Sequence, residues 1–304
     1  MRELLYFTKR NCLVYLRDRS AVFFSMLSMF IVLGLMILFL GNMNIEAVTG
    51  LIEEYKNRAV TAEETKNVTA LVQMWTVAGI LVVNSVTVTL TVLGSMVEDE
   101  TRKKIMAFYV TPVKRRFLAL GYILSAWIIG FFMCLLTLVA AEVYFTVKGY
   151  ELLSAISLVK LAGMILCNTF TFSAVGYLLA LFVHSEKAWS GMLTIIGTLV
   201  GFVGGIYLPV SQLTKNIQNI VKALPVLHGA SMMREISTKS LLDKTFAGMP
   251  EKFITAYKEE MGITVTIGGH MMDIRGQVLF LLGYACIAVI FAAIITRNRK
   301  LKDR

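Results

Sequence analysis

The side chains that most often carry catalysis are not arranged for it in this sequence. A membrane metalloprotease needs an H-E-x-x-H pattern, and a nucleophile elbow needs a strand-to-helix context that the triplet Gly229-Ala230-Ser231 lacks. No G-x-x-x-x-G-K-[ST] segment occurs, so the chain has no P-loop for ATP. The four cysteines are scattered, without metal-ligand or disulfide spacing. The histidines, His184, His228 and His270, all fall outside the apolar stretches. We therefore expect neither a catalytic residue nor a metal or cofactor of its own.

Composition places the chain in a membrane. Of its 304 residues, 57% are hydrophobic and 16% are charged, and the mean hydropathy is +0.70. Soluble domains are about 45–50% apolar and about 25% charged, which excludes a soluble enzyme, a disordered chain and a disulfide-rich secreted module. Six apolar stretches reach the roughly 20 residues that cross about 30 Å of hydrocarbon. These spans are expected near 21–41, 71–97, 117–141, 158–183, 188–208 and 277–296.

Basic residues gather on one side of the predicted spans. The segments 1–20, 98–116, 184–187 and 297–304 hold 17 basic and 7 acidic residues, a net charge of +10 that equals the charge of the whole chain. The positive-inside rule therefore places both termini in the cytoplasm, and an even number of spans agrees with this. We expect one transmembrane domain (1–304), multi-pass, in the cytoplasmic (inner) membrane of a bacterium. The basic charge is a topology signal and requires no nucleic-acid partner.

Residues 2–17 mix apolar and basic side chains. This pattern is typical of a helix that lies in the membrane interface, with its cations against anionic headgroups. A cytoplasmic extension of the first span explains the pattern equally well. On the opposite side, the acidic loop 42–70 is expected to be external and partly helical. The external segment 209–276 is expected to include an amphipathic helix around 251–261.

Two predicted spans carry polar or small residues on one face. In the second span these residues recur at steps of three and four, which keeps them on one side of a helix. Such a stripe avoids lipid, so it either lines a transport path or packs against neighbouring helices. Gly197 and Gly201 in the fifth span form a small-xxx-small pair that allows close packing, within the subunit or between subunits. The candidates are Asn84, Thr87, Thr91, Ser95, Thr194 and Thr198 for a substrate path, and Gly197, Gly201 and Gly205 for packing or a dimer interface.

The loop that follows the second span has an ordered pattern of charge. Three acids, Glu98-Asp99-Glu100, precede the bases Arg102-Lys103-Lys104, as a helix dipole favours. Apolar residues follow, and Thr111-Pro112 closes the segment because proline cannot extend a helix and restrains the residue before it. The pattern predicts one short charged helix over 98–112. An ordinary solvated loop is the alternative.

This loop resembles the first coupling loop of ABC type-2 exporter permeases, including the daunorubicin-resistance permease branch. The resemblance lies in the order of an acid, basic and apolar residues, Thr111-Pro112 and a basic run. Arg17-Asp18 resembles the end of the family's N-terminal helix. A second match resembles the family's external hairpin, whose short helices dip back into the outer leaflet. Its residues are Gly204-Gly205-Ile206-Tyr207-Leu208-Pro209-Val210, then Leu224-Pro225 and Met233-Arg234.

The resemblance, which covers essentially the whole chain, implies an architecture and partners. The fold class would be an all-α integral membrane protein with six transmembrane helices, an N-terminal amphipathic helix, a cytoplasmic coupling helix and an external re-entrant hairpin after the fifth span. The coupling loop would dock onto a separate ABC ATPase subunit, which would bind ATP and Mg²⁺. A second copy of the chain, or a paralogous permease, would complete the transporter in the lipid bilayer. The implied coupling residues are Glu98, Arg102, Ile105, Met106, Phe108, Thr111 and Pro112.

The implied function is export of an amphipathic, drug-like, lipid-like or peptide cargo with ATP hydrolysed by another subunit. An ion-coupled carrier or channel acting alone is the first alternative, but such carriers usually need a carboxylate deep in the membrane. None of the predicted spans contains one. A non-transporting scaffold or sensor is the second alternative, because the same loop would serve it.

Overall fold

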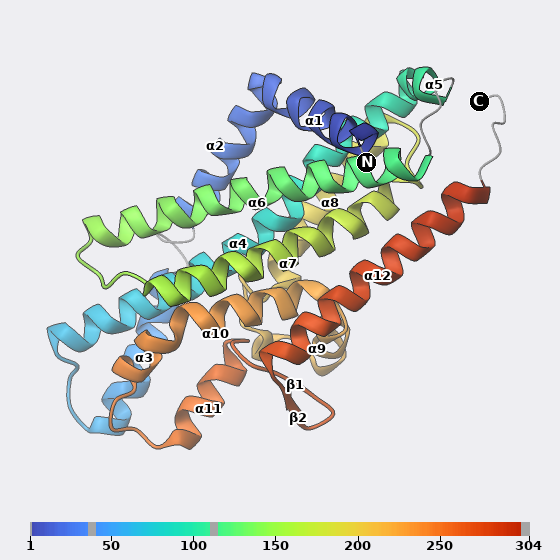
Figure 1. Ribbon diagram of the computed structural model, residues 1–304. Helices are drawn as coiled ribbons and strands as arrows, with labels where there is room; N and C mark the ends of the chain where they lie inside the picture. The colour runs from blue at the N-terminus through green and yellow to red at the C-terminus, as the bar shows by residue number, and fades with distance from the viewer. Residues whose placement is uncertain (1, 36–40, 110–114, 299–304) are drawn as a thin grey trace.

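The computed structural model describes residues 2–35, 41–109 and 115–298, which form a helical bundle with one small hairpin (Figure 1). The elongated bundle has α1 and α5 at one end and α3, α11 and the hairpin at the other. The elements are α1 (Arg2–Arg17), α2 (Arg19–Leu35), α3 (Gly41–Lys56), α4 (Ala62–Thr101), α5 (Lys104–Tyr109), α6 (Arg115–Val147), α7 (Ala155–Ala180), α8 (Glu186–Val203), the 3-10 helix η2 (Val210–Gln212), α9 (Lys215–Lys222), α10 (Pro225–Thr245), α11 (Glu251–Glu260), β1 (Val265–Ile267), β2 (His270–Met272) and α12 (Ile274–Asn298).

Helix α4 is the central element of the bundle. It runs for 40 residues, about 60 Å at 1.5 Å per residue, and packs against α6, α7, α8 and α10. A capping box starts it: the Thr61 hydroxyl accepts from the Glu64 N–H, and the Glu64 carboxylate accepts from the Thr61 N–H. Its middle is almost wholly buried, as expected for a helix surrounded by others.

Four of the described helices, α4, α6, α7 and α12, are long and apolar enough to cross a membrane. The chain is therefore an all-α membrane protein, as predicted. The predicted first and fifth spans coincide with α2 and α8, although residues 36–40 of the first lie outside the described residues; the count of six spans stays a prediction. Large apolar side chains such as Phe132 on α6, Val159 on α7 and Leu279 on α12 are exposed. Lipid is the environment that suits them.

The predicted helix at 2–17 is α1, and it is separate from α2. Asp18 divides the two helices, and its carboxylate accepts from the Ala21 N–H at 3.0 Å, which caps the start of α2. The prediction of a simple extension of the first span is therefore wrong. One face of α1, with Phe7, Asn11 and Tyr15, is buried against the bundle. The location of α1 in a membrane interface stays a prediction.

The segment after α8 folds into short elements at one end of the bundle. The predicted amphipathic helix is α11. The 42–70 loop is partly helical, as predicted: it contains most of α3 and the start of α4. Strands β1 and β2 pair antiparallel around Gly268-Gly269, whose positive φ angles of 59° and 82° suit a tight hairpin turn. The His228 ring lies 4.2 Å from the Phe280 ring, which fixes α10 to α12.

The predicted single helix over 98–112 is wrong. Helix α4 continues past residue 97 to Thr101, because no helix breaker lies in between and the Arg102 N–H still bonds the Glu98 carbonyl at 2.8 Å. Lys103 then takes a left-handed φ of 56°, which ends the helix. Helix α5 follows with only six residues. Glu98 therefore lies on the last turn of α4 rather than on the coupling helix.

Candidate functional site

An ion network surrounds the turn between α4 and α5. The Arg102 guanidinium contacts Glu98 at 3.1 Å and Glu186, on the first turn of α8, at 3.2 Å. Lys104 contacts the same Glu98 oxygen atom at 3.0 Å. Each exposed pair contributes at most about 1 kcal/mol, but Lys104 and Arg102 share the Glu98 carboxylate and Arg102 also reaches Glu186, so the network links α4, α5 and α8. The predicted residues Glu98 and Arg102 thus tie the base of α5 to both α4 and α8.

The apolar coupling residues lie on α5. Ile105 is half-buried, and 39% of Met106 is exposed. Phe108 belongs to the same helix, whereas Thr111 and Pro112 lie outside the described residues. An exposed thioether beside a half-buried isoleucine offers a small apolar contact surface at the end of the bundle.

Sequence reasoning missed a buried ion pair beside this network. The Arg10 guanidinium of α1 makes a two-point contact with the Asp99 carboxylate of α4, with one N–O distance of 3.0 Å. The Tyr122 hydroxyl of α6 donates to the same carboxylate at 2.7 Å. Only 4% of the Asp99 side chain is exposed. The hydrogen bond to Asp99 raises the pKa of Arg10 above its ordinary value, so the guanidinium stays protonated at physiological pH.

Close packing supports this ion pair. The Phe7 ring meets the Tyr122 ring edge-on, with the centroids 5.1 Å apart. Gly121 leaves the space that Phe7 fills, because a Cβ atom at Gly121 would lie 2.3 Å from the Phe7 ring. Helix α1 is therefore fixed to the ends of α4 and α6 that adjoin α5. The available sequence signal was an acid, Asp99, within one helical turn of an apolar span.

The predicted polar stripe divides into two parts. Asn84 is buried, and its amide donates to the Thr137 hydroxyl of α6 at 3.1 Å, which joins α4 to α6. Thr87, Thr91 and Ser95 are half-buried, and each hydroxyl bonds a carbonyl one turn back on α4. Interhelical packing therefore explains Asn84, whereas the other three side chains face a less enclosed side of α4.

Helix α8 also carries hydroxyl side chains among its predicted path residues. Thr194 and Thr198 are exposed, and each bonds a carbonyl four residues earlier. A Cβ atom at Gly197 would lie 4.0 Å from the Thr87 methyl group, so the two helices meet at this level. A hydroxyl that is already hydrogen-bonded within its own helix loses little free energy when an apolar molecule replaces water beside it.

The three predicted packing glycines have different neighbours within this chain. A Cβ atom at Gly201 would lie 2.3 Å from the Tyr207 ring, and Gly205 has a φ of 61° in the turn after α8. The Gly205 carbonyl accepts from Arg234 at 3.0 Å. Gly197 has the most space of the three. Gly201 and Gly205 therefore serve packing inside the subunit.

These environments predict opposite effects of two matched substitutions. We expect Gly201→Ala to lower the free energy of unfolding by about 1–2 kcal/mol, because Tyr207 must move. Gly197→Ala should be neutral or stabilising by up to about 1 kcal/mol, since alanine favours the helix and only ordinary contact results. Thermal unfolding of both variants in one detergent is the measurement. Equal losses would show that the Tyr207 contact is not formed.

Comparison with known protein families identifies the family to which the chain is similar. The family described as "ABC-2 family transporter protein" matches residues 49–297, which extend from within α3 to the penultimate residue of α12. No curated protein and no solved structure matches the chain significantly. The match is to the ABC-2 family as a whole, and the daunorubicin-resistance branch stays a prediction. The matched region covers far more than half of the sequence, and the chain therefore belongs to the ABC-2 family of transporter proteins.

Proposed function

We propose that this chain is the permease subunit of an ATP-driven exporter, and that α5 receives the motion of a separate ATPase subunit. The supporting observation is how the base of α5 is held. The Arg102 network joins it to α4 and α8, and the Arg10–Asp99 pair joins the same end of α4 to α1. A helix transmits force only when its base is anchored. Membership of the ABC-2 family supports the ATP-driven class.

In this proposal, α4 carries the motion through the membrane. It is one continuous helix of 40 residues, and its other half is held by Trp75, which donates to the Met261 carbonyl at 2.8 Å. A shift at Thr101 therefore reaches the external segment without an intervening break. Because α4 packs on α6, α7, α8 and α10, its shift also repositions their faces.

The ATPase would contact the surface of α5. Ile105 and Met106 supply apolar contact, and Phe108, Thr111 and Pro112 belong to the same proposed surface by resemblance to the family. Glu98 and Arg102 fix the direction in which α5 leaves α4. ATP and Mg²⁺ would be bound by the ATPase subunit, which would also carry out the hydrolysis. The concentration of basic charge supports a cytoplasmic position for this end, in the inner membrane of a bacterium.

The proposed path runs along the α4–α8 face, between this subunit and a second copy or a paralogous permease. Its walls are Thr87, Thr91 and Ser95 on α4 with Thr194 and Thr198 on α8. An apolar wall with a few hydroxyls provides no counter-charge for a bare ion. It suits an amphipathic cargo, drug-like, lipid-like or peptide, that moves outward.

The proposal predicts a specific loss from one exposed residue. Met106→Glu should reduce co-purification with the ATPase encoded beside this chain roughly tenfold, because a carboxylate would be buried in an apolar contact. The thermal midpoint should not change, since Met106 is exposed. Retention of the ATPase on the tagged chain and its ATP turnover in lipid nanodiscs are the measurements.

Phe253→Glu is the matched control. Phe253 lies on α11 at the opposite end of the bundle, 48% of it is exposed, and the substitution should leave ATPase binding unchanged. Unchanged ATPase binding by Met106→Glu would contradict the role of α5. Transport by the chain without any ATPase would instead support a carrier acting alone.

A further inference from the structure

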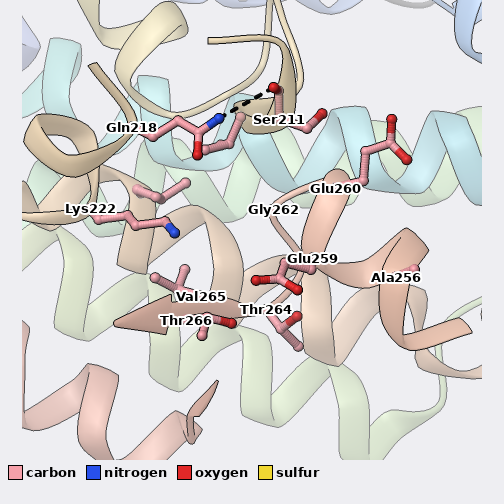
Figure 2. A pocket seen from close by; sticks show the side chains of 12 residues that line it. Ser211, Gln218, Lys222, Ala256, Glu259, Glu260, Gly262, Thr264, Val265 and Thr266 are labelled. Carbon is pink, nitrogen blue, oxygen red and sulfur yellow. Dashed lines mark hydrogen bonds between the residues drawn. The ribbon is translucent and has the colours of Figure 1, made fainter. Parts of the chain in front are cut away.

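A pocket of about 380 Å³ lies in the external segment, away from the α4–α8 face. It is bounded by η2, α9, the start of α10, α11 and β1. Its polar lining residues are Ser211, Gln218, Lys222, Glu259, Glu260, Thr264 and Thr266 (Figure 2). The volume is at the lower end of the range for small-molecule sites, so the pocket fits a small polar group rather than a whole lipid.

Opposite charges face this pocket from opposite sides. The Lys222 ammonium points in from α9, and the Glu259 carboxylate points in from α11, on the side of Thr264 (Figure 2). Among the described residues, no ion pair joins Lys222 to Glu259 or Glu260. The pocket therefore separates a cation from an anion instead of pairing them.

Hydroxyl and amide groups complete the lining. The Thr264 hydroxyl is buried and has no hydrogen-bond partner among the described residues. The Gln218 amide nitrogen is already used, since it donates to the Leu213 carbonyl at 2.8 Å and to the Ser211 carbonyl at 3.3 Å. A buried hydroxyl without a partner costs free energy that a ligand would recover.

One end of the pocket lies close to α12, a helix that is apolar enough to span a membrane. The carbonyl of Ala223, the residue after Lys222, accepts a hydrogen bond from the Tyr284 hydroxyl of α12. Tyr284 is ten residues from the outer end of α12, roughly 15 Å along a helix that is apolar enough to span a membrane. The headgroup layer is only about 5–8 Å thick. Helix α9 therefore ends at or below the headgroups of the outer leaflet.

Helix α9 carries two exposed isoleucines among its exposed polar residues, three positions apart and therefore on the same side of the helix. Ile217 and Ile220 are 45% and 62% exposed, whereas Lys222 lines the pocket. An amphipathic helix of this kind presents its apolar residues to acyl chains. The pocket thus offers a cation, an anion and an unpartnered hydroxyl beside a surface that contacts lipid tails.

We propose that this pocket binds the headgroup of an outer-leaflet aminophospholipid. Lys222 binds the phosphate, Glu259 and the Thr264 hydroxyl accept hydrogen bonds from the primary ammonium, and the acyl chains lie along Ile217 and Ile220. The recognised chemistry is a primary ammonium joined to a phosphodiester by a short linker. This site is independent of the proposed export path, so its test does not depend on transport.

The test is native mass spectrometry of the purified full chain titrated with dioctanoyl phosphatidylethanolamine. Three comparison ligands are titrated in the same way, and each lacks one recognised group. Phosphatidylglycerol lacks the ammonium, phosphatidylcholine lacks the ammonium hydrogens, and free phosphoethanolamine lacks the acyl chains. We expect phosphatidylethanolamine to bind roughly tenfold more tightly than each of these. Equal binding of phosphatidylglycerol would overturn the role of Glu259, and equal binding of free phosphoethanolamine would overturn the lipid as its source.

Two variants and two matched controls test the residues. Lys222→Met should weaken phosphatidylethanolamine binding roughly tenfold, and Glu259→Gln should abolish the preference over phosphatidylglycerol. The controls, Lys215→Met on α9 and Glu251→Gln on α11, change exposed residues that do not line the pocket and should bind like the wild type. Wild-type binding by both Lys222→Met and Glu259→Gln would refute the site.

Discussion

Arg10→Met is expected to lower the free energy of unfolding by about 2–4 kcal/mol. The substitution leaves the Asp99 carboxylate buried with the Tyr122 hydroxyl but without its cation. Removing one partner of a fully buried pair costs about 3–5 kcal/mol, and the estimate is lower here because 31% of the Arg10 side chain is exposed. Thermal or denaturant unfolding in detergent measures the loss.

The neighbouring residue provides the control. Lys9→Met removes an equal charge from the exposed face of α1 and should change stability by less than about 0.5 kcal/mol. The double variant Arg10→Met/Asp99→Asn should recover part of the loss, because it no longer buries an unpaired charge. Strictly additive losses in the double variant would show that Arg10 and Asp99 do not interact.

The second large effect is expected at Arg234, which is fully buried on α10. Its guanidinium lies 4.3 Å from the Trp75 ring centroid and donates to the Gly205 carbonyl at 3.0 Å. It also contacts the carbonyls of Met261 and Gly262 at 3.3 and 3.4 Å. One side chain thus joins the turn after α8, the end of α11 and the outer half of α4.

Arg234→Leu should therefore destabilise the segment between α8 and α12 by about 2–4 kcal/mol. The buried carbonyls of Gly205 and Gly262 lose a charged donor, at about 1–3 kcal/mol each, whereas the Met261 carbonyl still accepts from Trp75. The release of a buried cation offsets part of the loss. Limited proteolysis between α9 and α12, together with thermal unfolding, measures the effect. Lys239→Leu on the exposed side of α10 is the control. If both variants resist protease equally, Arg234 does not hold the segment together.

Hydropathy predicted the four helices that are long and apolar enough to cross a membrane, because such a helix needs a long apolar stretch that the sequence displays directly. The prediction of one helix over 98–112 was wrong because the apolar stretch ends at residue 97, before α4 ends at Thr101. Charged residues can continue a helix into water, so Glu98 and Asp99 extend α4 beyond its apolar part. The turn at Lys103 depends on a left-handed φ that lysine seldom adopts, so the residue types at this position did not predict a turn.

The residues that hold the candidate site were harder to predict. Arg10 and Asp99 are 89 residues apart, and Trp75 meets an arginine on α10. Such pairs depend on how helices pack, which a single sequence does not record. The polar stripe is a second example. Helical spacing predicts that Asn84, Thr87 and Thr91 share one face, but of these three residues Asn84 alone forms a hydrogen bond to α6, whereas the two threonines bond carbonyls of α4.

The most direct test of the coupling account is site-specific photocrosslinking at position 106. A photoreactive amino acid replaces Met106 on α5 in one sample and Phe253 on α11 in another, with the neighbouring ATPase co-expressed. Crosslinked products are identified by peptides that contain the ATPase P-loop. The account predicts an ATPase adduct at position 106 that changes in yield when ATP is added, and none at position 253. No ATPase adduct at position 106, or equal adducts at both positions, would contradict it.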